Sequence, residues 1–183
     1  MLWPFNHFRK PHPTPRGTIE AIYGMIVTQA REPIFYRDLG VPDTVEGRFD
    51  LVLLHLWLLL RRLRTAENSG ALSQALFNRF CEDMDDNLRE MGVGDLAVPK
   101  RMQAFGEAFY GRARAYDQAV EEGGEALASA ICRNILNGAE IEQARRLAAY
   151  ARTVEGDLSG TDEVSLLRAA FKFPSPSGED IAP

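Results

Sequence analysis

The residues most able to do chemistry lie in one acidic run that contains Asp83, Asp85, Asp86 and Asn87. Carboxylates at this density suggest a metal ion, but a calcium-binding loop also needs a glycine that is missing here. Prenyl-transferring helical enzymes bind magnesium between two aspartate-rich helices, and the chain has only one such motif. The run therefore predicts an acidic surface, either solvated or bound to a partner, and no metal site.

His55 is the only histidine beyond the first sixteen residues, and it lies in an apolar run. No nucleophile or carboxylate stands at a spacing that suits catalysis, so a core histidine is favoured over a general base, with a gating or partner role left open. Cys81 and Cys132 form no CxxC pair and are expected to be buried reduced thiols. No Ser-His-Asp or Cys-His arrangement can be assembled. These observations argue against an enzyme and imply no cofactor.

The elements that must position these residues are helices, because apolar side chains recur every three to four positions along most of the chain. A link over 32–43, rich in proline and glycine, is expected to pack on the core. The predicted helices cover residues 18–32, 44–64, 69–91, 99–122, 125–136, 140–154 and 162–171.

The second predicted helix is apolar on every face from Leu51 to Leu60 apart from His55. A helix of this kind is surrounded by other elements, and its apolar run is too short for the roughly 20 residues of a membrane span. We therefore expect an all-α, single-domain bundle of about seven helices around a buried central helix. The bundle covers residues 17–173, between a flexible tail at 1–16 and a disordered tail at 174–183.

Composition narrows the range of functions. A length of 183 residues suits one domain, and a net charge of −5 argues against binding DNA through a positive surface. The first tail carries Trp3, Phe5, Phe8, Arg9 and Lys10, a mixture found at bilayer interfaces, so peripheral membrane contact is an alternative to a free tail.

Gly92 and Pro99 predict the turn between the third and fourth predicted helices, because glycine suits a helix end and proline suits a helix start. It presents acidic residues on one helix and basic residues on the next. Arg48, Arg112 and Arg114 have the alternative of pairing with the acidic helix. The candidate partner-binding residues are Asp83, Asp85, Asp86, Glu90, Asp95, Lys100, Arg101, Arg112 and Arg114, with Tyr110 and Tyr116 as aromatic anchors.

Three segments carry a family resemblance: YRDLGVPDTVEGRFDLVLLHLWLLLRRL (36–63), LFNRFCEDMDDNLREMGVGDLAVPKRMQ (76–103) and AFYGRARAY (108–116). Over residues 17–122 the chain resembles the ubiquinol–cytochrome c chaperone family. Mitochondrial members of that family help to assemble respiratory complex III, hold newly made cytochrome b, act with a small partner subunit and associate with the ribosome.

The resemblance implies a non-enzymatic assembly chaperone that binds cytochrome b or an assembly intermediate of complex III. A small partner subunit or the ribosome are further partners that it suggests. The N-terminus is rich in proline and poor in serine, unlike a mitochondrial presequence. We therefore expect a bacterial protein that acts in the cytoplasm, at the periphery of the inner membrane. The alternative from the residues is a helical isoprenoid- or lipid-binding protein or enzyme that uses the aspartate-rich helix.

Overall fold

The computed structural model describes residues 14–67, 69–138 and 141–176, which form eight helical segments and contain no strand. The predicted all-α class is confirmed. The aromatic and basic residues of the N-terminal tail and the last seven residues lie outside this part of the chain. The helices are α1 (Arg16–Ala30), α2 (Pro33–Arg37), α3 (Val45–Leu63), α4 (Gly70–Glu90), α5 (Val98–Glu122), α6 (Ala126–Asn134), α7 (Ile141–Gly160) and α8 (Glu163–Leu167).

Local sequence explains where most helices begin. Thr44 caps α3, since its hydroxyl oxygen accepts a hydrogen bond of 3.1 Å from the Gly47 amide. Pro99 occupies the first turn of α5, where a missing N–H is harmless. Pro33 was expected only to end a helix, yet it also begins the short helix α2 inside the predicted link. The link nevertheless packs on the core as expected, because Phe35 is fully buried.

The helix α3 lies at the centre of the bundle and packs against α1, α4, α5 and α7. Its apolar side chains are buried on every face, and Trp57 is only 2% exposed. The indole N–H of Trp57 donates a hydrogen bond of 3.0 Å to the carboxylate of Asp117 on α5. The predicted buried central helix is therefore present, and Trp57 belongs to the core.

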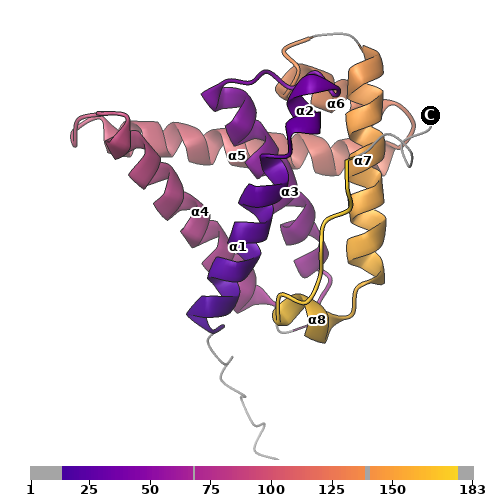
Figure 1. Cartoon of the computed structure of the whole chain (residues 1–183), viewed down its shortest axis with the longest axis horizontal. Coiled ribbons are helices and arrows are strands. Elements are labelled where there is room, and N and C mark those ends of the chain that lie inside the picture. Colours follow the sequence, from indigo (N-terminus) through magenta and orange to yellow (C-terminus); the bar gives the residue numbers. More distant parts are fainter. Residues whose placement is uncertain (1–13, 68, 139–140, 177–183) are drawn as a thin grey trace, which may run out of the picture.

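Figure 1 shows α4 and α5 diverging from the body and meeting in a corner at one edge of the molecule. The opposite end of α5 packs against α6, which in turn packs against α7. Between α4 and α5 the core is largely aromatic, and it includes Phe80 and Phe109, whose ring centroids lie 5.9 Å apart. The corner is thus held at its base by packed rings while its tip extends away from the core.

The C-terminal part differs from expectation in two places. Helix α7 continues to Gly160, beyond the predicted end at residue 154. Helix α8 ends at Leu167, and residues 168–176 follow without a helix. Residues 174–176 were assigned to a disordered tail, but Pro176 is buried and the Pro174 carbonyl accepts a hydrogen bond from Gln29.

Candidate functional site

The turn between α4 and α5 has the hydrogen-bond pattern that ends a helix with a left-handed residue. Gly92 has φ = 80°, and its amide donates to the Arg89 carbonyl at 2.9 Å. The next amide, of Val93, donates to the Leu88 carbonyl at 3.0 Å. These two bonds satisfy carbonyls that the last turn of α4 would otherwise leave free. The predicted role of Gly92 is confirmed, and the turn holds the two charged helices in a defined corner.

Three of the candidate aspartates have partners within the protein. Asp83 accepts a hydrogen bond of 2.9 Å from the Tyr23 hydroxyl of α1. Arg89 forms ion pairs with both Asp85, at 2.6 Å, and Asp95 across the turn. These bonds brace the corner, while the single charge of Arg89 offsets only one of its two carboxylates.

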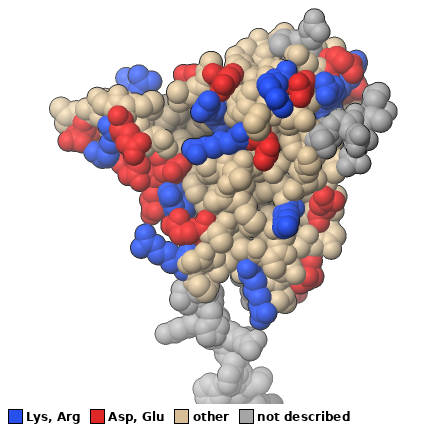
Figure 2. Space-filling model, viewed as in Figure 1, with Lys and Arg blue, Asp and Glu red and all other residues tan. Residues whose placement is uncertain are grey.

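Asp86 and Glu90 are exposed and form no ion pair with any described residue. Glu82, which the sequence reasoning did not include, is exposed and unpaired in the same way within the described chain. The three lie at i, i+4 and i+8, so helical spacing alone could have added Glu82 to the set. Like charges at this spacing repel one another on a helix. Figure 2 shows acidic side chains gathered along the edge of the molecule that α4 forms. We call Glu82, Asp86 and Glu90 the acidic ladder.

The basic side of the corner comes from the first half of α5. Lys100, Arg101 and Arg114 are exposed and have no ion-pair partner among the described residues. They lie on a different helix from the acidic ladder. The corner therefore carries an acidic surface on α4 and a basic surface on α5.

Arg112 does not belong to that surface. Its guanidinium lies 2.7 Å from the carboxylate of Asp50 on α3 and above the ring of Phe49. Burial raises the pKa of Asp50 to about 7, although the positive charge of Arg112 opposes that shift. Arg48 pairs with Asp43 at 2.8 Å. Arg48 and Arg112 thus form ion pairs within the protein, as the alternative held, but their partners are Asp43 and Asp50 and not the acidic helix.

The two aromatic candidates, Tyr110 and Tyr116, differ in their exposure to solvent. Tyr110 is 63% exposed, and its ring packs on Phe77 at 5.7 Å between centroids, so it is available to a partner. Tyr116 is fully buried, and placing it at the surface was wrong. It faces the core because it lies on the same side of α5 as Phe109. At the tip of the corner, Leu96 is 100% exposed and Met91 56% exposed, and the sequence reasoning missed both.

His55 is fully buried and has both ring nitrogens engaged. Its Nδ1 lies 2.7 Å from the Leu51 carbonyl, so this nitrogen carries the proton. Its Nε2 lies 2.8 Å from the Tyr150 hydroxyl and therefore accepts a hydrogen bond. Burial lowers the pKa of His55 to about 4. The neutral core histidine that the sequence favoured is confirmed.

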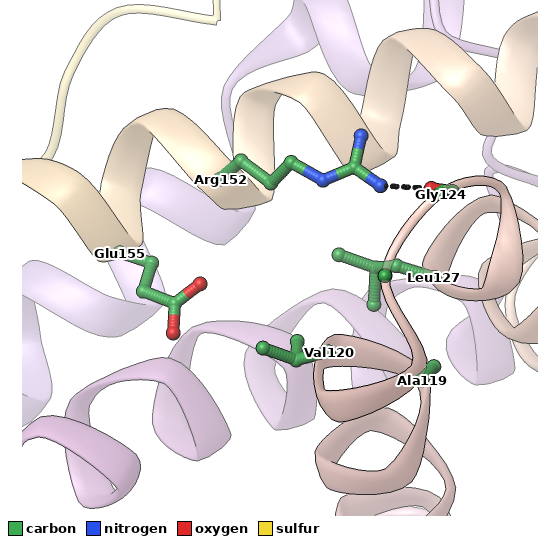
Figure 3. Close-up of a pocket in the computed structure, with 7 residues that line it drawn as sticks. Ala119, Val120, Gly124, Leu127, Arg152 and Glu155 are labelled. Atoms are coloured by element: carbon green, nitrogen blue, oxygen red, sulfur yellow. Dashed lines mark hydrogen bonds between the residues drawn. The ribbon is translucent and has the colours of Figure 1, made fainter.

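An open hollow of about 320 Å³ lies where the end of α5 and the start of α6 face α7 (Figure 3). The guanidinium of Arg152 closes one side by donating a hydrogen bond of 2.6 Å to the Gly124 carbonyl. Neither His55 nor any candidate aspartate lines the hollow, so it gives no support to the lipid-binding alternative. The residues that line it are Ala119, Val120, Gly123, Gly124, Leu127, Arg152 and Glu155.

Two further properties of the described residues bear on other functions. No three His, Cys, Asp or Glu side chains gather there closely enough to hold a metal ion. None of the helices in that part of the chain combines the length and apolar character needed to cross a membrane.

Comparison with known proteins identifies the family. The family model described as Ubiquinol-cytochrome C chaperone matches residues 37–173. Ubiquinol-cytochrome-c reductase complex assembly factor 1 of Xenopus laevis is 26% identical over 141 residues, which cover 71% of this chain and 70% of that protein. The Homo sapiens protein of that name is 29% identical over 151 residues, covering 76% of this chain and 50% of that protein.

A solved structure extends the agreement to three dimensions. The crystal structure of the Cbp3 homolog from Brucella abortus matches with a TM-score of 0.80 and 34% identity, covering 87% of this chain and 90% of that one. This chain spans half the length of the human relative. Because the family model covers most of the chain and the fold agrees over nearly all of it, this chain belongs to the ubiquinol-cytochrome c chaperone family.

Proposed function

We propose that this protein is a non-enzymatic assembly chaperone that binds cytochrome b, or an assembly intermediate containing it, during the formation of respiratory complex III. Family membership supports the chaperone role, and two relatives are named as assembly factors of the ubiquinol-cytochrome c reductase complex. The observation that carries the binding site is the corner between α4 and α5. It combines unpaired charge with the exposed apolar side chains of Leu96 and Met91.

The corner suits a client for a physical reason. Repulsion within the acidic ladder is a free-energy cost that the folded protein retains. A client segment with basic side chains relieves that repulsion when it binds. Leu96 is fully exposed and gains most from being covered by an apolar surface. A positively charged segment beside an apolar one, as at the end of a membrane span, therefore matches this surface.

Lys100, Arg101 and Arg114 provide the second half of the proposal. Their unpaired charges are suited to an acidic region of the client, of a small partner subunit or of the ribosome. They are equally suited to anionic lipid at the periphery of the inner membrane. We place the protein there, on the cytoplasmic side of a bacterial membrane, so that it meets its client close to the site of insertion.

Deletion of the gene tests the function. Complex III activity and the amount of cytochrome b should both fall, and expression of the chain should restore them. Normal assembly in the deletion strain would contradict the proposed function. A role specific to complex III also requires that another respiratory complex, measured in the same membranes, keeps its activity.

Charge reversal tests the site. Asp86→Lys with Glu90→Lys should weaken capture of cytochrome b from detergent-solubilised membranes by about fivefold or more, without lowering the melting temperature. The matched control reverses Glu121 and Glu122, two exposed carboxylates at the end of α5 that lies away from the corner. Equal capture by wild type and by the Asp86 and Glu90 double variant would show that the acidic ladder is not the binding site.

A further inference from the structure

The segment after α8, residues 168–176, crosses the body of the protein without forming a helix (Figure 1). We call it the strap. It lies where α1 and α7 both pack on α3 but, within the described chain, scarcely touch one another. Phe171 is 8% exposed and belongs to the main core, and Phe173 packs against that core. The strap therefore fills a groove whose floor is the central helix.

Its contacts reach the central helix α3 and the wall formed by α1. The ring of Phe173 meets the imidazole of His55 edge-on, with 5.2 Å between centroids. The Pro174 carbonyl accepts a hydrogen bond of 2.9 Å from the side-chain amide of Gln29 on α1. The same Gln29 nitrogen donates to the Tyr150 hydroxyl of α7 at 3.0 Å. A chain of hydrogen bonds thus runs from His55 through Tyr150 and Gln29 to the strap.

This chain of hydrogen bonds does not depend on the strap. His55, Tyr150 and Gln29 bond to one another across three helices. Only one donor of Gln29 turns to Pro174, and water can replace that bond when the strap leaves. The bonds that link the three helices beside the strap are therefore complete without it.

The strap is attached mainly by its side chains. The main chain of residues 171–173 forms no hydrogen bond within the described part of the protein, although the neighbouring amide of Ala170 bonds locally to the Ser165 carbonyl. Ala169, with φ = 59°, belongs to the turn that ends α8, where its amide bonds to the Leu166 carbonyl.

We propose that the groove between α1 and α7 binds an extended segment of another chain, with aromatic residues two positions apart followed by proline, and that the strap is its resident intramolecular ligand. The sequence FKFP at 171–174 shows which chemistry the groove accepts. A segment of the same kind from a client or partner competes for the groove and displaces the strap. This proposal is independent of the corner between α4 and α5.

The test uses the full chain and a fluorescent peptide with the sequence of residues 169–176, AAFKFPSP. The peptide should bind Phe173→Ala about tenfold more tightly than wild type, because the weakened strap leaves the groove open for a larger fraction of the time. A peptide with both phenylalanines changed to serine is the control and should not bind. Binding should also shift the NMR signals of the His55 ring, which identifies the groove as the site.

Phe173→Leu is a milder change of the same contact and should also strengthen peptide binding, by less than Phe173→Ala. Failure of the peptide to bind either variant, with both folded, would overturn the proposal. The proposal would also be overturned if the protein forms dimers and does not bind the peptide. In that case the groove would bind the strap of a second copy of this chain.

Discussion

The imidazole of His55 is kept neutral by its burial, because a second proton would place a charge in the core. Burial therefore lowers the pKa of His55 far below that of a free histidine, although the hydrogen bond to the Leu51 carbonyl opposes the shift. The neutral ring has a proton on Nδ1, which faces that carbonyl, and a lone pair on Nε2, which accepts from the Tyr150 hydroxyl.

A pH dependence follows from that shift. The pKa of His55 falls from 6.5 to about 4 on folding, so the unfolded chain takes up the proton first. The contribution of neutral His55 to the free energy of unfolding is complete above pH 6.5. It is lost as the pH falls from there toward 4. The stability advantage of wild type over His55→Gln should therefore shrink by about 3 kcal/mol between neutral pH and about pH 4. Urea unfolding of both proteins at several pH values measures it. Asp50 is present in both, so its titration cancels, and a constant difference would contradict the assignment.

At the scale of the elements, Gly92 can be compared with Gly94, a second glycine in the same turn. Gly92→Val should lower the free energy of unfolding by about 1–3 kcal/mol, because a β-branched residue resists the left-handed region that Gly92 occupies at φ = 80°. Gly94→Val should cost much less, since Gly94 does not have a positive φ and a β-carbon there would meet no other atom. Chemical denaturation of the two variants compares them. Equal losses would show that the backbone at Gly92 is not the cause.

The start of α3 depends on a second glycine. A β-carbon on Gly47 would collide with the main-chain carbonyl of Pro42, and a main-chain atom cannot move aside by changing rotamer. Gly47→Ala should therefore lower the free energy of unfolding by about 2 kcal/mol or more. Gly24→Ala in α1 is the control. A β-carbon there meets nothing, so this change should raise stability by about 0.5–1 kcal/mol. Stabilisation by both substitutions would contradict the close approach.

The sequence predicts the longer helices well because each carries an apolar stripe and a recognisable start or stop. It does not predict α2, whose five residues are too few to show a period. It underestimates α7, since Gly156, Ser159 and Gly160 suggest an end that packing against α6 and α3 overrides. The candidate site shows the same limit. Spacing finds the unpaired charges, but the partners of Arg112 and Asp83 lie on helices distant in sequence, and only the tertiary fold brings them together.

At the scale of the whole molecule, Asp117 connects α3 to α5. Its carboxylate accepts hydrogen bonds from Trp57 at 3.0 Å and from Arg61 and Arg64 at 2.8 Å. Arg61 also reaches Glu155 on α7 at 3.0 Å, so one cluster joins three helices. The surrounding positive charges hold the pKa of Asp117 below its usual value. The cluster keeps the end of the central helix in register with two of its neighbours.

Asp117→Asn should lower the free energy of unfolding by about 1–2 kcal/mol, because it leaves the partly buried Arg61 and the exposed Arg64 without their shared carboxylate. Asp157→Asn is the control, since Asp157 is an exposed carboxylate on α7. It should change stability by less than about 0.5 kcal/mol. Thermal unfolding of both variants gives the comparison. A similar small effect of the two changes would show that the cluster does not hold the helices together.

The central position of α3 also sets the order in which the protein can complete its own folding. The partners that cover its last face come late in the chain, since Tyr150 lies 95 residues after His55 and Glu155 lies 94 after Arg61. During synthesis the most apolar helix is therefore made early and closed late. Until α7 emerges, the nascent chain exposes a surface prone to aggregation. A chain that ends before α7 should accumulate as insoluble protein, so a member of a chaperone family passes through a stage in which it needs protection itself.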